Sequence, residues 1–391
     1  MELVSEIKDK QLTEIIRRLM EEKYTLGRLT RVREVLGGYC NKSYAVWMSS
    51  MENSRRYFLR LYNAKAVEKE IRFEHALVNH LRSNGFTLAA AVIAASDGST
   101  LVRTPAPQHH GAPEALWALF EFLEGEDPYS WIKTDLTDTA FASGAEILAR
   151  LHQCGRDFRK PAGTDRVQPR IMDFLATFQE TFGNYLKQAG ERRCDRYFKE
   201  HFPTITNAIE EGLAFTDRFR GMPELPIHCD YHPGNLKYRD EQGVGIFDFD
   251  WSKIDYRLFD LALALVYFVS VWDDQKTGLR QDKFILFLQT YHTTCGQLDQ
   301  IEPLTDQERQ YLLPMLAIAN LYLVNWDLTD FYVVVDQPED DEYFYYIHHN
   351  IAMIDWINAH KAHLARWIDS ALAMCSSHAG VDFHDTRSES A

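Results

Sequence analysis

Three polar side chains with characteristic spacing lie in the second half of the chain: Asp230, Asn235 and Asp248. The first two belong to residues 228–235 (HCDYHPGN), and Asp248 follows after a short polar turn. This spacing matches the H-x-D-x-x-x-x-N sequence and the later metal-binding Asp that serve phosphoryl transfer. A carboxylate can accept the proton of an attacking hydroxyl, and amide and carboxylate oxygens are ligands that suit Mg²⁺. The pattern predicts Asp230 as the catalytic base and Asn235 and Asp248 as metal ligands.

The same segment departs from ordinary protein kinases at two positions. Cys229 replaces the Arg of H-R-D, and Asp248-Phe249-Asp250 stands where D-F-G is expected. The Pro233-Gly234 pair suits the tight turn that returns Asn235 to Asp230, because Pro fixes φ and Gly tolerates positive φ. We therefore expect a phosphotransferase site outside the ordinary protein kinases.

Residues 228–235 and 246–250 resemble the motif of the aminoglycoside phosphotransferase, choline kinase and type II homoserine kinase superfamily, and the likeness extends over about residues 31–270. The resemblance implies an α+β, protein-kinase-like fold of two lobes. The N-lobe is small and β-rich with one main helix, and the larger C-lobe is mostly helical. ATP and Mg²⁺ are the implied cofactors. The resemblance also implies Asp250 as a further Mg²⁺ ligand, and Asp260 as a residue that caps a buried helix and braces the catalytic loop.

Residues 56–62 alternate apolar and cationic side chains and read as a strand. By resemblance, Arg60 occupies the position of the strand cation that contacts the nucleotide phosphates. Residues 67–81 have helical spacing, with an apolar face made of Phe73, Leu77, Val78 and Leu81. Glu74 in this helix matches the carboxylate that pairs with the strand cation, and Glu70, one turn earlier, is the alternative.

Two further segments of the first third would contact the nucleotide. Residues 36–44, which include Gly38 and Asn41, lie between two strand-like runs and would form the hairpin that covers the phosphates, although G-x-G-x-x-G is absent. Residues 116–125 read as an apolar strand that ends in a glycine and resembles the hinge of the family. The resemblance places the adenine contacts at Glu121, Phe122 and Leu123.

The organisation of the chain is continuous, without internal repeats. We expect an N-terminal nucleotide-binding lobe with a leading helix over residues 1–124, and a helical lobe with the catalytic loop and the acceptor site over residues 125–374. Residues 375–391 are rich in Ser, His and Asp and are expected to be disordered.

Composition limits the partners. The net charge of −15 disfavours a nucleic-acid or anionic-membrane surface and is compatible with a cationic substrate. The N-terminus lacks a signal-peptide core, the longest apolar run is too short to span a bilayer, and the six cysteines are scattered without C-x-x-C pairs. These features predict a cytoplasmic protein with reduced thiols.

The preferred function is phosphorylation of a hydroxyl of a small molecule such as an amino alcohol, an amino acid or an aminosugar. Acidic residues after the hinge (124–127) and in the C-terminal third, including Asp327 and Asp330, would suit its ammonium group. The aromatic residues from Trp326 to Tyr346 would either pack the lobe or enclose that group. Three alternatives stay open: a protein Ser/Thr kinase of the same fold, a catalytically silent relative, and a metal hydrolase built on H-x-D-x-H.

Overall fold

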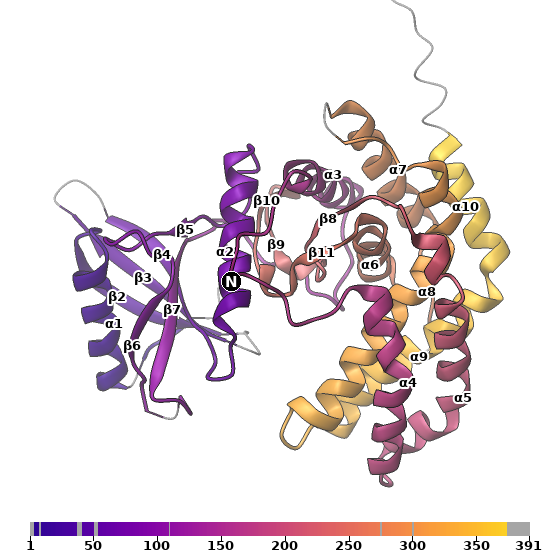
Figure 1. The fold of residues 1–391 in the computed structure, drawn as a ribbon, viewed down its shortest axis with the longest axis horizontal. Helices are drawn as coiled ribbons and strands as arrows, with labels where there is room; N and C mark the ends of the chain where they lie inside the picture. The colour runs from indigo at the N-terminus through magenta and orange to yellow at the C-terminus, as the bar shows by residue number, and fades with distance from the viewer. Residues whose placement is uncertain are drawn as a thin grey trace, which may run out of the picture.

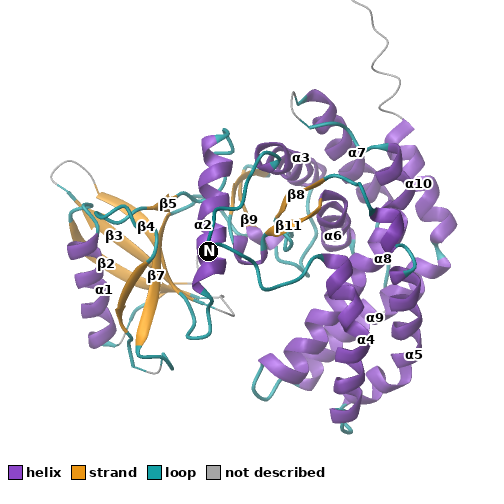
Figure 2. Cartoon of the chain, viewed as in Figure 1, coloured by secondary structure: helices purple, strands orange, loops and turns teal. Residues whose placement is uncertain are grey.

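The computed structural model describes residues 4–7, 9–36, 41–50, 54–108, 110–273, 276–298 and 301–373. Gly38 and the tail from 375 lie outside the described residues, so the predictions made for them are not tested. A strand-rich N-terminal part stands beside a larger helical part, with α2 between them (Figure 1; Figure 2). The predicted α+β, protein-kinase-like architecture is confirmed.

The N-terminal lobe is built on an antiparallel sheet. Its elements are β1 (Val4–Ser5), α1 (Lys10–Lys23), β2 (Arg28–Val35), β3 (Lys42–Ser49), β4 (Ser54–Leu61), α2 (Glu68–Ser83), β5 (Val92–Ile93), β6 (Val102–Pro105) and β7 (Glu114–Glu121). The strand order is β1-β2-β3-β4-β7-β5, and β6 also pairs with β7. The register sets Arg60 of β4 opposite Ala118 of β7, and Tyr57 opposite Glu121.

Two helices cover opposite faces of this sheet. Helix α1 begins where the Asp9 carboxylate accepts the backbone N–H groups of Gln11 and Leu12, and its apolar side packs on one face with Leu59, Leu119 and other buried residues. Helix α2 lies toward the other lobe (Figure 1). Its predicted apolar face is confirmed, because Phe73, Leu77, Val78 and Leu81 are buried in the core of the C-terminal lobe.

The C-terminal lobe surrounds short strand pairs with helices. Its elements are α3 (Asp138–Gly155), α4 (Ile171–Gln188), α5 (Arg193–Leu213), η1 (Thr216–Phe219), β8 (Glu224–Ile227), η2 (Pro233–Asn235), β9 (Leu236–Arg239), β10 (Gln242–Ile246), η3 (Phe249–Trp251), β11 (Lys253–Tyr256), α6 (Arg257–Val269), α7 (Gln281–Gln297), α8 (Asp306–Thr329), η4 (Asp330–Val334), α9 (Asp340–Ala359) and α10 (Lys361–Ala373). Strand β9 pairs with β10, and β8 pairs with β11.

The segment that follows β7 attaches the sheet to the C-terminal lobe. Glu126 and Tyr238 exchange backbone hydrogen bonds of 2.8 and 3.0 Å, and the Ile246 N–H donates to the Leu88 carbonyl at 3.0 Å. Gly125 has φ 141°, and a Cβ there would lie 3.0 Å from the Tyr238 carbonyl oxygen. This close approach explains why the predicted hinge ends in glycine.

Helix α8 and the π-helical turn η4 form a long apolar segment. Residues 306–334 are long and apolar enough to cross a membrane by length and composition. However, 67% of the most apolar window is buried within the lobe, which is the environment of a core helix. The segment contacts α4, α5, α6 and α9, so its apolar character follows from packing.

Candidate active site

The catalytic loop, residues 228–235, lies between β8 and β9 and is anchored by one buried carboxylate. Asp260 accepts the backbone N–H of His228 at 2.9 Å and that of Cys229 at 2.8 Å. Its Oδ2 atom also accepts a hydrogen bond of 3.0 Å from His152 Nε2 of α3. Burial opposes ionisation of Asp260, but the hydrogen bond and charge of His152 hold its pKa below the ordinary value. The carboxylate therefore fixes the start of the loop, where Cys229 has φ 64°.

The predicted capping role of Asp260 is wrong, whereas its bracing role is confirmed. Helix α6 begins at Arg257 with Tyr256 as its N-cap, so Asp260 lies inside the first turn. From there its side chain points to the loop rather than to the helix terminus. His152 and Tyr291, which complete this buried network, were not predicted from the sequence.

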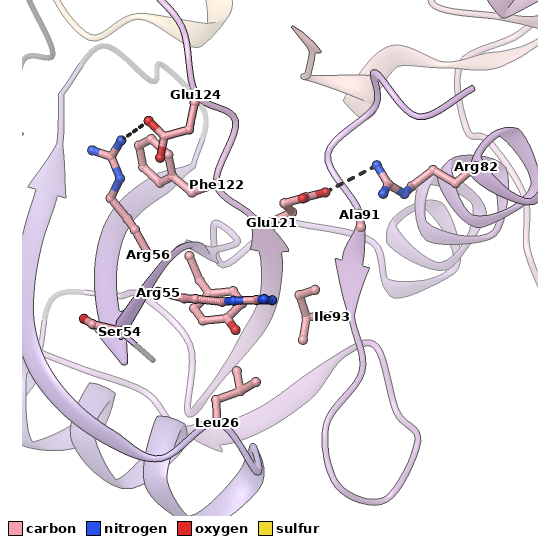
Figure 3. A pocket seen from close by; sticks show the side chains of 11 residues that line it. Leu26, Ser54, Arg55, Arg56, Arg82, Ala91, Ile93, Glu121, Phe122 and Glu124 are labelled. Atoms are coloured by element: carbon pink, nitrogen blue, oxygen red, sulfur yellow. Dashed lines mark hydrogen bonds and ion pairs between the residues drawn. The ribbon is translucent and has the colours of Figure 1, made fainter. Parts of the chain in front are cut away.

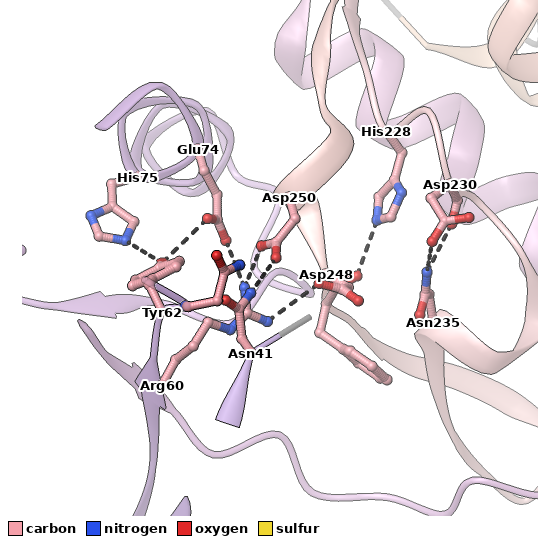
Figure 4. A network of polar contacts seen from close by, with 12 residues as sticks. Asn41, Arg60, Tyr62, Glu74, His75, His228, Asp230, Asn235, Asp248 and Asp250 are labelled. Atoms are coloured by element: carbon pink, nitrogen blue, oxygen red, sulfur yellow. Dashed lines mark hydrogen bonds and ion pairs between the residues drawn. The ribbon is translucent and has the colours of Figure 1, made fainter. Parts of the chain in front are cut away.

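Both carboxylate oxygens of Asp230 receive a hydrogen bond. Asn235 Nδ2 donates to the Oδ2 atom at 3.0 Å and to the Asp230 carbonyl at 2.8 Å (Figure 4). The Tyr267 hydroxyl of α6 donates to Oδ1 at 3.0 Å, and the ring of His232 packs beside Tyr267. Sequence reasoning missed Tyr267, whose only signal is a hydroxyl within the apolar run of α6. The carboxylate is thus held in one orientation, facing away from the core of the loop.

Asp248 directly follows the β9–β10 hairpin and has a left-handed backbone, with φ 66°. The loop supports this conformation, because His228 Nε2 donates to the Phe247 carbonyl at 3.0 Å. Burial, followed by the negative charge of Asp250, raises the pKa of Asp248 to about 7. Two partly exposed carboxylates that repel each other favour a bound cation, so the donor set fits Mg²⁺.

Arg60 connects the sheet to both carboxylates. Its guanidinium lies 3.4 Å from Asp248 Oδ1 and 3.4 Å from Glu74 Oε1, and it also forms an ion pair with Asp250 (Figure 4). Asn41 Nδ2 donates to Asp250 at 2.8 Å. Burial and the charge of Asp250 raise the pKa of Glu74 to about 8, and Arg60 opposes this shift. Of the residues predicted on the phosphate side, Arg60 and Asn41 therefore contact Asp250, and Glu74 contacts Arg60.

The structure distinguishes the two glutamates of α2. Glu74 contacts Arg60 and accepts a hydrogen bond of 3.3 Å from the Tyr62 hydroxyl. Glu70 instead accepts the Val167 backbone N–H at 2.8 Å, in the segment before α4. The two residues are one turn apart on the same side of the helix, so their different positions along its axis bring only Glu74 to Arg60.

The hinge prediction covers Glu121, Phe122 and Leu123. The Glu121 N–H already donates to the Ala91 carbonyl at 2.8 Å, and its carboxylate lies 3.3 Å from Arg82. The guanidinium of Arg56 lies 3.6 Å above the ring of Phe122. Within the predicted segment, the backbone of Phe122 and Leu123 is therefore better placed than Glu121 to bind adenine.

The candidate acceptor side is acidic and aromatic. Asp327 of α8 accepts a hydrogen bond of 2.7 Å from Asn350 of α9. Burial raises its pKa to about 8, with the charge of Asp330 adding to the shift, and burial raises the pKa of Asp330 to about 6. Nearby ring pairs are Trp251–Trp326, Trp131–Tyr346 and Trp272–His349, with centroids 4.5, 4.5 and 3.7 Å apart. Asp330 lies on a π-helical turn, a feature frequent at functional sites.

Two of the acidic residues after the hinge have cationic partners within the protein. Glu124 forms an ion pair of 2.7 Å with Arg56, and Asp127 forms one of 2.6 Å with Lys237. Their charges are already matched by side chains of the protein. The prediction stays untested for all four residues, and we carry forward Asp327 and Asp330, which have no cationic partner among the described residues.

The hydrolase alternative finds no support in the described ranges. His228 is buried, and its Nε2 atom is occupied by the Phe247 carbonyl. The His232 Nδ1 atom accepts the Gly234 N–H at 3.0 Å. Among the described residues, no group of three His, Cys, Asp or Glu side chains has the geometry of a metal site.

The fold and the site together define a kinase-like phosphotransferase. Residues 31–295 match the model of the phosphotransferase enzyme family named APH, and the chain belongs to this family. It is similar to a homoserine kinase of Polaromonas naphthalenivorans, with 27% identity over 328 residues, which cover 82% of this chain and 89% of the relative. A homoserine kinase of Zymomonas mobilis is 24% identical over 80% of this chain and 88% of its own length.

Solved structures share the fold at low identity. An aminopropanol kinase associated with a microcompartment aligns with a TM-score of 0.65 and 17% identity, over 89% of this chain and 98% of its own. An amicoumacin kinase in complex with AMP-PNP aligns with a TM-score of 0.63 and 14% identity, over 89% of this chain and 93% of its own. The chain is accordingly a small-molecule phosphotransferase that acts on a hydroxyl group.

Proposed function

We propose that this protein transfers the γ-phosphoryl group of ATP, in the presence of Mg²⁺, to the hydroxyl of a small molecule that carries an ammonium group. The observation that carries the acceptor class is Asp327, a carboxylate with a side-chain partner in Asn350 but no cationic partner among the described residues. Because burial raises the pKa of this carboxyl to about 8, a cationic ligand beside it would favour its ionised form. ATP rather than another donor is supported by the bound AMP-PNP of the amicoumacin kinase.

Asp230 is the group that receives the acceptor proton. The donors Asn235 and Tyr267 fix its two oxygens. A remaining lone pair can then accept a hydrogen bond from the hydroxyl group of the substrate. The hydroxyl oxygen then attacks the γ-phosphorus in line, the bond from that phosphorus to the bridging oxygen breaks, and ADP leaves. Asp230 takes the proton late in the step, so its role does not require an unusual basicity.

Asp248 and Asn235 would hold Mg²⁺, with Asp250 as a further ligand. The ion neutralises phosphate charge when it is bound with the nucleotide. Arg60 is placed by Glu74 at the edge of this carboxylate group and would contact the phosphates. Phe122 and Leu123 would bind adenine through their backbone, and Asn41 would order the hairpin by its bond to Asp250.

Aromatic side chains near the catalytic loop would enclose the apolar part of the acceptor. The backbone of Ser130 packs against Gly234, which places the neighbouring Trp131 and its ring partners beside the loop. Trp326 precedes Asp327 on α8 and packs on Trp251. An ammonium group over such rings gains cation–π attraction in addition to its pairing with the carboxylate.

The lobe division at residues 124 and 125 and a cytoplasmic location belong to this proposal. The boundary is supported by Gly125, where the chain crosses to the helical lobe. The location is supported by the free thiols of the described cysteines Cys154, Cys194, Cys229 and Cys295.

The test is a turnover assay that follows ADP formation with Mg²⁺-ATP and a matched set of acceptors. L-homoserine, 3-aminopropan-1-ol and propan-1-ol share a primary hydroxyl and differ in their charged groups. We expect turnover with at least one of the two amines and none with propan-1-ol. Asp230→Asn should reduce turnover at least about a hundredfold while ATP binding is retained. Turnover of propan-1-ol as fast as that of the amines would contradict the cationic acceptor, and full activity of Asp230→Asn would remove Asp230 from its role.

A further inference from the structure

A hollow of about 770 Å³ lies behind the hinge, in the N-terminal lobe. It is bordered by the start of β4, by β5, by the end of β7 and by the last turn of α2 (Figure 3). Its volume falls within the range of small-molecule sites, about 300–1,000 Å³. The lining residues are Leu26, Ser54, Arg55, Arg56, Tyr57, Arg82, Ala91, Ile93, Glu121, Phe122 and Glu124.

The apolar part of this hollow lies on the opposite face of the sheet from Arg60. Successive side chains of a strand point to opposite faces, so Tyr57 faces away from Arg60. Tyr57, Leu26 and Ile93 all pack against the hydrophobic cluster beneath α1. The register pairs Tyr57 with Glu121, which sets the Glu121 side chain on the same face. Arg56 and Phe122, which lie on the Arg60 face, also border the hollow, so it reaches around the hinge edge of the sheet.

The arginines that line the hollow outnumber its glutamates. Arg82 pairs with Glu121 at 3.3 Å, and Arg56 pairs with Glu124 at 2.7 Å. Arg55 forms no ion pair or side-chain hydrogen bond with another described residue, and its guanidinium extends into the hollow toward Ile93 (Figure 3). Arg55 is thus a lining arginine without an ion-pair partner in the described part of the chain, whose net charge is −15.

We propose that this hollow binds a small carboxylate that has an apolar or aromatic body. A guanidinium presents paired N–H donors that match the two oxygens of a carboxylate. The adjacent lining made by Leu26, Tyr57 and Ile93 is apolar and would take the body of the ligand. The charges of Glu121 and Glu124 are matched by Arg82 and Arg56, so Arg55 is left to match the single charge of a monocarboxylate.

The site would communicate with the nucleotide through the hinge. Glu121 and Phe122 line the hollow and also belong to the segment predicted to contact adenine. A carboxylate bound to Arg55 would also attract Arg82 and weaken its ion pair with Glu121, because the Glu121 carboxylate is half-exposed. By linkage, any change in nucleotide affinity is matched by an equal change in carboxylate affinity. This coupling, unlike the site itself, rests on the proposed function.

The experiment uses benzoate as the probe and the full-length protein. Ligand-observed NMR titration gives the dissociation constant of benzoate for the wild type, for Arg55→Gln and for Arg17→Gln. Arg17 is a matched control, because it is an exposed arginine of α1 and does not line the hollow. We expect Arg55→Gln to weaken benzoate binding at least about tenfold, as for a lost charge-assisted hydrogen bond, and Arg17→Gln to leave it unchanged.

A second titration contains saturating Mg²⁺-AMP-PNP. We expect benzoate still to bind, with an affinity changed about fivefold or more in either direction, and the change to be lost in Arg55→Gln. Equal benzoate affinity in the wild type and in Arg55→Gln would overturn the site. A benzoate affinity that keeps falling as the nucleotide concentration rises, without reaching a limit, would show direct competition in the cleft and would also overturn it. A protein that binds benzoate through Arg55 but binds no nucleotide would refute the proposed function and leave the site intact.

Discussion

The orientation of one carboxylate depends on residues from three parts of the chain. Asp230 is held by Asn235 of its own loop and by Tyr267 of α6, while Asp260 fixes the start of the loop. A carboxylate whose two oxygens are already bonded loses little freedom when the acceptor arrives. Tyr267 is therefore a positioning residue in the proposed reaction, acting through Asp230.

Tyr267→Phe tests this role. The variant keeps the ring that packs beside His232 and removes only the hydroxyl that donates to Asp230. We expect kcat to fall about tenfold, since a hydrogen bond to a charged group contributes about 1.5–3 kcal/mol, with little change in the KM of ATP. Steady-state kinetics and AMP-PNP calorimetry separate the two effects. Tyr197→Phe, a half-buried tyrosine of α5, is the control, and an equal loss in both variants would contradict the assignment.

Asp248→Ala and Asn235→Ala test the metal assignment. Removal of a charged ligand should lower Mg²⁺-nucleotide affinity together with turnover, and added Mg²⁺ should restore only part of the activity. Asn235→Ala removes a neutral ligand and should show a milder form of the same defect. Isothermal titration calorimetry of Mg²⁺-AMP-PNP measures the affinity directly. Wild-type affinity in Asp248→Ala would show that this carboxylate does not hold the ion.

At the scale of elements, α8, η4 and α9 bring together side chains that are distant in sequence. Asp327 near the end of α8 meets Asn350 of α9, and Asp330 lies in the π-helical turn between the two helices. The predicted tight turn that returns Asn235 to Asp230 is confirmed, because such a turn is encoded by adjacent residues. The acceptor side is assembled from separate helices, so the sequence allowed only a class of acidic candidates.

The raised pKa of Asp327 predicts a pH dependence. Only the ionised form would pair with an ammonium group, so kcat/KM for a cationic acceptor should rise with pH up to about 8, the value to which burial raises this pKa. Asp327→Asn should have a lower kcat/KM that lacks this ascending limb. A pH–rate profile measures both, and an identical limb in the variant would exclude Asp327 as its origin.

The raised pKa of Asp327 also makes the folding stability depend on pH. Because the folded-state pKa lies above that of the unfolded chain, the folded form binds the proton more tightly. The contribution of Asp327 to stability is therefore present at low pH and declines as pH rises from about 4, the ordinary value for Asp, toward 8. The free energy of unfolding of Asp327→Asn, measured with urea, should not decline over this pH range. A packing defect would instead lower the stability equally at every pH.

At the scale of the whole molecule, two lobes meet where Arg60 and Asn41 of the sheet contact Asp250 of the helical lobe. Buried apolar residues of α2 join the core of the C-terminal lobe, so the lobes share a hydrophobic contact in addition to the hinge. The overall charge of −15 gives the molecule a field that attracts cations and repels nucleotides.

The field predicts opposite salt effects for the two substrates. Raising ionic strength from about 0.01 to 0.5 M shortens the Debye length from about 30 Å to less than 10 Å, which screens surface charge. The KM of a cationic acceptor should rise severalfold, while the KM of ATP should not rise. Kinetics in KCl at constant free Mg²⁺ measure both values. A parallel rise of both would indicate a general salt effect instead.

The sequence by itself determined the fold class, the catalytic loop and the contact between Asp230 and Asn235, which are five positions apart. Asp230, Asn235 and Asp248 are recognisable because a tight turn and a hairpin fix their separation through local geometry. The tertiary structure decided which of two glutamates meets Arg60, that Asp260 braces the loop from inside α6, and that Glu124 and Asp127 are already paired. It also revealed Tyr267 and the hollow behind the hinge. These contacts join residues up to 110 positions apart, and they are set by packing of helices and sheet, which local spacing does not encode.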